Sequence, residues 1–181
     1  MTVDTILEYT PENAVLAAFV LLLLFAIKSF TVVIPLSVLY LASGIIFPPV
    51  TAILVSTAGL GITISIPYHI GKYGGNKIIN AICNKYPKLD HIAKFQHNNA
   101  FFICFITRIV GFLPGDIVSL YLGSCKIDFP TYLAEGICGS MLSIITTTLL
   151  GANLSNPFSV QFILILLLRI LISVSSIIIK L

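Results

Sequence analysis

Charge is what this sequence has least of. Only 9% of its 181 residues are charged and 57% are hydrophobic, whereas soluble domains carry about 25% charged residues. A chain so poor in charge cannot cover a surface that faces water, so lipid must solvate much of it. Its length predicts one domain, and its longest polar stretch, residues 71–99, is too short for a soluble catalytic domain.

Close cysteine pairs and metal-ligand spacings are also missing. Three of the four cysteines lie in apolar segments, where a free thiol behaves as a small hydrophobe. The histidines, at positions 69, 91 and 97, lack ligand spacing, so we expect no metal and no cofactor. No basic soluble face with base-stacking partners is present, which excludes nucleic acid as the expected partner.

Four apolar stretches predict membrane-spanning helices, near residues 14–34, 50–70, 131–151 and 158–180. At 1.5 Å per residue, each covers most or all of a hydrocarbon core of about 30 Å. The first continues past Lys28 and Ser29 to Ile34, and the third is interrupted only by Glu135.

Two further apolar stretches are broken by proline. Residues 37–46 lie between Pro35 and Pro48, which leaves about ten helical residues or roughly 15 Å. Residues 100–124 are broken around Pro114, which leaves arms of roughly 20 Å and 13 Å. Short helices at membrane depth need protein or a water-filled cavity around the break. We therefore expect two re-entrant hairpins, with one proline-kinked spanning helix at each place as the alternative.

The two broken stretches resemble each other. Residues 35–44 align without gaps to residues 114–123, with a helix-capping residue, Ser37 or Asp116, two positions after the proline. A glycine, Gly44 or Gly123, follows at plus nine. Each stretch then runs into Phe-Pro and a spanning helix. Interrupted segments in matching places of two halves are typical of transporter binding sites built from inverted repeats.

This repeat divides a single membrane domain into two halves. The half-repeats cover residues 14–71 and 99–152, with a linker at 72–98 and a C-terminal spanning helix at 158–180. The linker carries five lysines, so the positive-inside rule places it, and with it both termini, in the cytoplasm. Apolar residues at three- and four-residue steps over 76–96 predict an amphipathic helix, lying on the membrane interface or packed on the membrane domain.

The second broken stretch carries a recognisable motif. Residues 108–129 hold an arginine, a short apolar step, Pro-x-Asp, a small polar residue, an aromatic, a glycine and a basic residue before the next helix. This pattern resembles the DedA or SNARE-associated Golgi protein (VTT-domain) superfamily. The first half agrees: Pro35 and Ser37 with Gly44 match its first hairpin, and Tyr68-x-x-Gly71-Lys72 matches its Tyr-x-x-Gly-Arg ending. The resemblance covers roughly residues 30–152.

The resemblance implies an all-α integral membrane protein with about four spanning helices and two opposed re-entrant hairpins. Members of the superfamily are implicated in moving lipids between leaflets, including undecaprenyl phosphate and ordinary phospholipids. The expected function is thus a transporter or scramblase of a phosphate-bearing lipid, in the plasma (inner) membrane if the source is prokaryotic. Membrane lipids are the expected partners, and a homo-oligomer stays open.

This chain also departs from the family. Many members carry a glutamate beside the first-hairpin proline and an aspartate before the Tyr-x-x-Gly motif. Here no acid occurs between Glu12 and Asp90, and Gly111 stands where relatives often have a proline. A transport cycle driven by protonation of first-half acids is therefore not expected.

Arg108 is the leading candidate for chemistry. A guanidinium at membrane depth costs several kcal/mol unless paired, and its planar fork suits a phosphate. A structural contact with Asp116 or with helix-end carbonyls is the alternative. Asp116 stands where a helix cap is expected, and a proton or counter-ion role is open to it as well.

Three other charged residues lie in apolar stretches. Glu135 is close enough to an interface to stay solvated, and a neutral buried carboxyl or a partner for a base are both open to it. Lys28 either contacts a phosphate or snorkels to the interface, the latter being favoured. Arg169 pairs with Glu135 or with another subunit, or has a function of its own. We expect the substrate site to combine these charges with the hairpin tips: Lys28, Pro35, Ser37, Arg108, Pro114, Gly115, Asp116, Tyr121 and Glu135.

Two competing functions belong to other classes. The hairpins of a non-transporting membrane scaffold would serve assembly alone. An intramembrane enzyme needs an acid–base or nucleophile–base pair on facing elements, and the sequence offers only Asp116, Glu135 and scattered serines. We therefore expect the protein not to be an enzyme.

Overall fold

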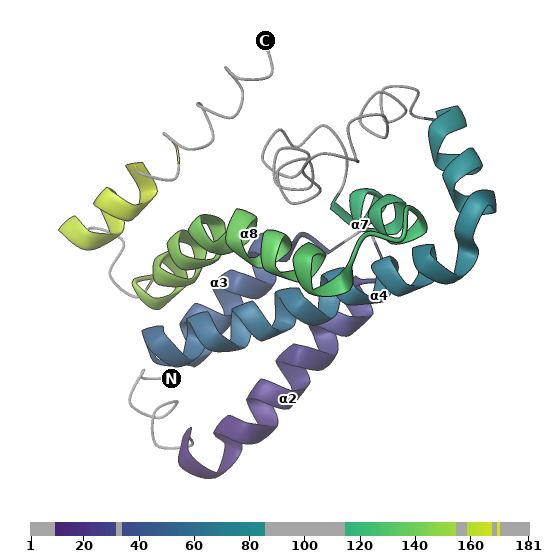
Figure 1. Cartoon of the computed structure of the whole chain (residues 1–181). Helices are drawn as coiled ribbons and strands as arrows, with labels where there is room; N and C mark the ends of the chain where they lie inside the picture. Colours follow the sequence, from purple (N-terminus) through teal and green to yellow (C-terminus); the bar gives the residue numbers. More distant parts are fainter. Residues whose placement is uncertain (1–9, 32–33, 86–114, 155–158, 168–169, 171–181) are drawn as a thin grey trace.

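A computed structural model describes residues 10–31, 34–85, 115–154, 159–167 and 170 of the chain. These residues form helices and no strand, as the all-α class predicts. The helices, in chain order, are α2 (Thr10–Lys28), α3 (Leu36–Ile46), α4 (Pro49–Lys85), α7 (Gly115–Ser124) and α8 (Phe129–Ala152) (Figure 1).

Two helices are long and apolar enough to cross a membrane. They are residues Pro49–Gly75 of α4 and the whole of α8, Phe129–Ala152. At 1.5 Å per residue they measure roughly 40 Å and 36 Å, which exceeds a hydrocarbon core of about 30 Å. Gly75 ends the apolar part of α4 with a φ of 50° and a ψ of −137°, a conformation that favours glycine, and residues 76–85 continue as a further helical segment.

The predicted first span, residues 14–34, is wrong at its C-terminal end. Helix α2 ends at Lys28, and the chain turns at Ser29 and Phe30. A run of β-branched residues before Pro35 explains the ending, because such residues favour helix weakly and a residue before proline is pushed away from helical geometry. The apolar part of α2, Ala14–Lys28, is shorter than a typical span. The predicted span at 158–180 falls mostly outside the described residues.

The two short helices match the broken stretches. Helix α3 has 11 residues and α7 has 10, or roughly 16 Å and 15 Å, too short to cross a bilayer. Residues 29–35 separate α2 from α3, so these two are not one kinked helix. The break at Pro114 lies outside the described residues. Whether α3 and α7 are re-entrant stays a prediction.

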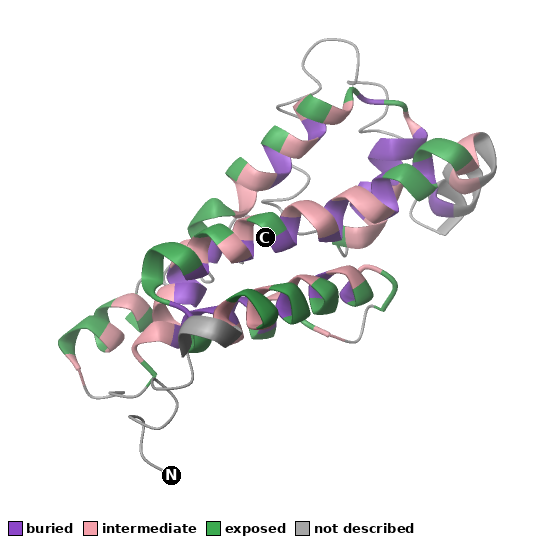
Figure 2. Ribbon diagram, turned by 90° about the horizontal axis from the view of Figure 1, so that it is seen from below, coloured by how far each residue is buried: buried purple, intermediate pink, exposed green. Residues whose placement is uncertain are grey.

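Helices α4 and α8 run antiparallel through the centre of the fold (Figure 1). Ser56 of α4 lies 3.4 Å from Thr148 of α8, hydroxyl to hydroxyl, near the end of α8. Further along α4, the Ile64 carbonyl accepts a hydrogen bond of 3.0 Å from Tyr132, near the start of α8. The buried residues follow the faces on which the helices meet (Figure 2).

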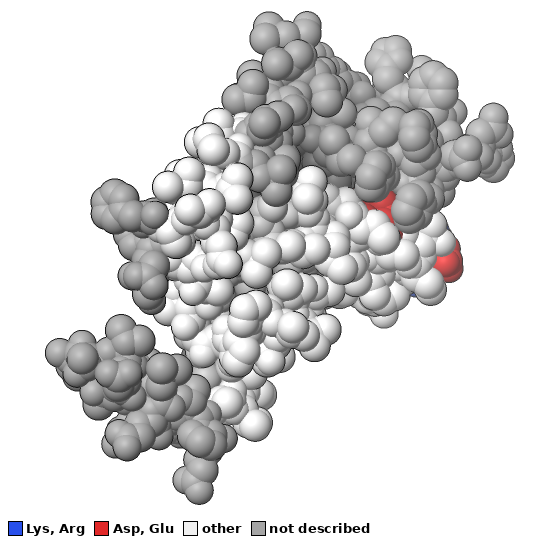
Figure 3. All heavy atoms as spheres, turned by 90° about the vertical axis from the view of Figure 1, so that its left-hand side faces the viewer, with Lys and Arg blue, Asp and Glu red and all other residues white. Residues whose placement is uncertain are grey.

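The outward faces of the helices are apolar and exposed. Large hydrophobic side chains are exposed along α2, α3, α4 and α8, for example Phe19 at 65% and Leu54 at 65%. Figure 3 shows one such face, on which the described residues carry acid at one end only. Exposed apolar surface of this extent is solvated by lipid in a membrane protein and would aggregate in water.

Candidate functional site

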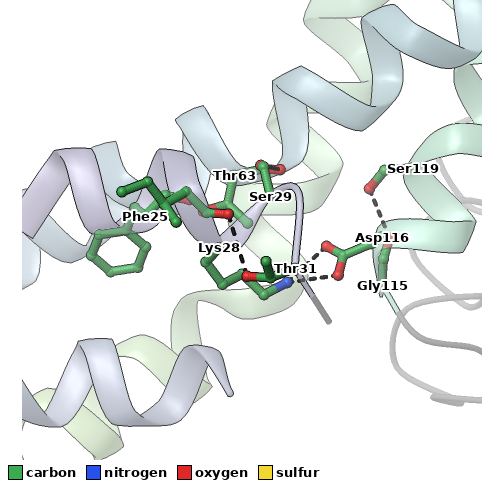
Figure 4. A network of polar contacts seen from close by, with 9 residues as sticks. Phe25, Lys28, Ser29, Thr31, Thr63, Gly115, Asp116 and Ser119 are labelled. Atoms are coloured by element: carbon green, nitrogen blue, oxygen red, sulfur yellow. Dashed lines mark hydrogen bonds and ion pairs between the residues drawn. The ribbon is translucent and has the colours of Figure 1, made fainter. Parts of the chain in front are cut away.

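A buried ion pair joins the C-terminus of α2 to the N-terminus of α7 (Figure 4). The Lys28 Nζ atom lies 2.8 Å from Oδ1 and 2.7 Å from Oδ2 of Asp116. The side chains are only 8% and 19% exposed, respectively. Each charge also lies at the helix end whose dipole stabilises it, the cation in the last turn of α2 and the anion in the first turn of α7.

Helix α4 fixes the end of α2 that carries Lys28. The Thr63 hydroxyl donates a 2.9 Å hydrogen bond to the Phe25 carbonyl, and the Ser29 hydroxyl donates a 2.6 Å bond to the Thr63 carbonyl. Phe25 is itself fully buried, with its ring 5.9 Å from that of Tyr40. These two bonds on either side of Lys28 hold its backbone, so the ammonium is presented to α7 in a fixed place.

Glycines let α7 lie directly on α4. A Cβ atom on Gly123 would stand 2.0 Å from the Tyr68 carbonyl oxygen, and one on Gly71 would stand 2.0 Å from the Leu120 carbonyl oxygen. Real Cβ atoms never approach so closely, so only glycine fits at both positions. The Ser124 hydroxyl adds a 3.0 Å hydrogen bond to the Gly71 carbonyl. The position of Asp116 therefore depends on this crossing.

The same contact recurs between α3 and α8. A Cβ on Gly44 would stand 1.9 Å from the Thr148 carbonyl oxygen, and one on Gly151 would stand 2.3 Å from the Leu41 carbonyl oxygen. Leu41 and Gly44 of α3 take the places that Leu120 and Gly123 take in α7. Helix α3 thus packs on α8 and helix α7 packs on α4, and the two crossings use matching residues.

Tyrosine side chains tie α4 to the start of α8. The Tyr68 hydroxyl donates a hydrogen bond to the Ile127 carbonyl in the turn between α7 and α8. The Tyr68 ring stacks on that of Tyr132, with centroids 4.6 Å apart and an interplanar angle of 24°. The predicted Tyr-x-x-Gly motif therefore has a structural use: Tyr68 anchors the turn and Gly71 lets α7 pack closely on α4.

The structure brings some of the predicted site residues together and leaves others apart. Lys28, Gly115 and Asp116 meet at the ion pair, whereas Pro35 precedes α3 in extended conformation and Ser37 is half-buried in its first turn. Tyr121 is buried in α7. Lys72 of the motif is exposed. Arg108 and Pro114 lie outside the described residues, as does Arg169.

Two expectations about charged residues are wrong. Lys28 does not snorkel, because its side chain is buried and its ammonium contacts Asp116. Glu135 does not stay solvated: it is 0% exposed in the interior of α8. Asp116 contacts a base, which supports a counter-ion role, but the base is Lys28 and lies 88 positions away in sequence.

Sequence reasoning missed two residues that shape this site. Thr63, which holds the end of α2, carries no motif, and only the structure reveals it. Gly151 did carry a signal, because Thr148-x-x-Gly151 repeats the spacing of Tyr68-x-x-Gly71 before the end of each long helix.

Apolar outward faces, two helices of spanning length and a buried charge pair between helix ends define a helical membrane protein with a polar centre. The sequence profile of the VTT domain matches residues 34–153, two thirds of the chain. The chain belongs to this family, the DedA/SNARE-associated Golgi protein family, whose members are membrane proteins proposed as transporters and are generally not enzymes. No curated protein and no solved structure matches the chain.

Proposed function

We propose that this protein is a transporter or scramblase that moves a phosphate-bearing lipid, a polyprenyl phosphate or a phospholipid, between membrane leaflets. The buried Lys28–Asp116 pair is the observation that carries the proposal. It keeps a cation in an apolar helical bundle, where an unpaired charge is costly, by means of an anion on a different helix. A lipid phosphate can take the place of the carboxylate, because it offers the ammonium the same kind of oxygen acceptor.

The proposal includes an inverted repeat with α3 and α7 as re-entrant hairpins. Its support is the reciprocity of the two glycine crossings and the antiparallel course of α4 and α8, which a twofold axis in the membrane plane requires of matching helices. The ion pair then lies between one half and the hairpin of the other, the place where transporters of this type bind substrate.

Arg108 lies six residues before Pro114, much as Lys28 lies seven before Pro35, and is the second base proposed to hold the phosphate. In liposomes with fluorescent lipids, including a polyprenyl phosphate, we expect the wild-type protein to expose inner-leaflet label to an external quencher. Arg108→Ala should abolish this movement in a folded protein, and Arg108→Lys should retain little of it, because a point charge loses the bidentate fork. A stable and fully active Arg108→Ala protein would falsify this assignment.

The same assay separates a transporter from a membrane scaffold. A scaffold needs the close glycine crossings but no mobile anion, so it would leave the label protected in every reconstituted sample. Wild-type liposomes that stay sealed to the quencher, with correct protein insertion verified by protease digestion, would favour the scaffold.

The orientation follows from the lysine-rich linker. Residues 72–98 and both termini are proposed to be cytoplasmic in a multi-pass protein. Lys85→Cys should therefore react with a membrane-impermeant maleimide only after the cells are opened. The cysteine-free background, which replaces the four native cysteines, is the control for specific labelling. Reaction at position 85 in intact cells would reverse the topology.

A further inference from the structure

An open groove of about 350 Å³ lies between the turn after α2 and the outward face of α4. This volume falls at the low end of the range for small-molecule sites. Six residues line it, none of them acidic: Phe30, Ser65, Ile66, His69, Ile70 and Tyr73. The groove lies in the last turns of the apolar part of α4, before the bend at Gly75.

The groove has an apolar wall on each side. Ile66, Ile70 and Tyr73 follow each other at helical spacing along α4, and the Phe30 ring faces them from the turn after α2. Phe30 is 71% exposed, Ile70 44% and Tyr73 86%. In a bilayer such surfaces contact lipid chains, and a tyrosine near the end of a span is typical of the interfacial layer.

A polar stripe borders the apolar wall. Ser65, His69 and Lys72 occupy matching steps along α4. The His69 Nδ1 atom lies 2.8 Å from the Ser65 carbonyl, which can only accept, so Nδ1 donates and Nε2 of the neutral ring is an acceptor. Packing fixes the ring, with centroids 5.0 Å from Phe129 and 5.4 Å from Tyr68. Lys72 adds an exposed cation one turn further on.

We propose that this groove binds one phosphate-bearing lipid, with a chain between Phe30 and the Ile66–Tyr73 wall and the phosphate against Lys72 beside the groove. Charge complementarity selects an anionic headgroup, and the apolar walls select a chain. Phe30, which lines the groove, follows Lys28 by two residues along the chain. The identity of the lipid rests on the proposed function.

The absence of tryptophan from the chain allows a direct test. Phe30→Trp places a single fluorophore in the groove, and Phe19→Trp, on the exposed face of α2, is the matched control. Both are reconstituted into phosphatidylcholine containing a small fraction of phosphatidylglycerol with brominated chains, which quench tryptophan on contact. We expect stronger quenching of the Phe30→Trp protein than of the control, because the groove concentrates the anionic lipid.

Further variants complete the test. Lys72→Gln in the Phe30→Trp background should lower the enrichment of phosphatidylglycerol at the groove about fivefold, as expected for one basic side chain near anionic lipid. Ile70→Trp supplies a reporter on the opposite wall if Phe30→Trp does not fold. The proposal would be overturned if brominated phosphatidylglycerol quenched the Phe30→Trp and Phe19→Trp proteins equally. It would also be overturned if brominated phosphatidylcholine were enriched at the groove as much as brominated phosphatidylglycerol.

The quenching is read at equilibrium and needs no lipid movement. If Phe30→Trp is quenched more strongly than the control but no lipid moves in the liposome assay, the transport proposal is wrong and the groove proposal is supported. If lipid moves but Phe30→Trp is quenched no more than the control, only the groove proposal is wrong.

Discussion

Alanine in place of Gly44 or Gly123 is expected to destabilise the protein strongly. The added Cβ would stand 1.9 Å or 2.0 Å from a backbone carbonyl oxygen of the opposing helix. Neither backbone can yield without separating the helices, because each crossing has glycine on both sides. Overpacking costs about 1–3 kcal/mol where side chains can adjust, so we expect about 3 kcal/mol or more at these positions. The melting temperature should then fall by about 6–12 °C.

Gly61→Ala on α4 is the matched control. A Cβ there would meet only Leu133, at 4.0 Å, an ordinary contact. Alanine also favours a helix interior over glycine by about 0.5–1 kcal/mol, so this variant should be as stable as the wild type or more stable. Circular dichroism at 222 nm in detergent reports the unfolding, since the chain has no tryptophan to follow. Wild-type melting of Gly44→Ala or Gly123→Ala would show that the crossings are looser than described.

Some helix boundaries could be predicted because proline marks them locally. Helix α3 starts directly after Pro35 and ends just before Pro48, and α8 starts around Pro130. The end of α2 was also readable in principle, from the β-branched residues before Pro35. The prediction of a helix to Ile34 is too long because hydropathy alone does not distinguish a helical apolar run from a non-helical one.

The partners of the charged residues could not be predicted, because they depend on helix packing. Lys28 and Asp116 lie 88 positions apart, and nothing local in either segment indicates the other. Burial of Glu135 is hidden for the same reason: its distance from the start of α8 suggested an interface, but the opposing helices cover it. The repeat contained the information in part, since it places a base before each hairpin and an acid in only one of them.

The second large effect is expected at the ion pair. Asp116→Asn or Lys28→Met leaves one charge of a buried pair without its partner, at a cost of about 3–5 kcal/mol for full burial. Because the Asp116 side chain is 19% exposed, we expect the free-energy cost of Lys28→Met to lie at the low end of this range. Both single variants should lose thermal stability and lipid movement together. Lys126→Gln, at an exposed lysine in the turn before α8, is the control that should keep both.

The double variant Lys28→Met/Asp116→Leu separates stability from function. Replacing a buried ion pair by apolar residues of similar volume is often neutral or stabilising, so the melting temperature should return to about the wild-type value. Lipid movement should stay absent, because the cation that exchanges carboxylate for phosphate is gone. A double variant that is both stable and active in the liposome assay would reduce the pair to a structural contact. If Lys28 exchanges the carboxylate for a lipid phosphate, the double variant should regain thermal stability but not lipid movement.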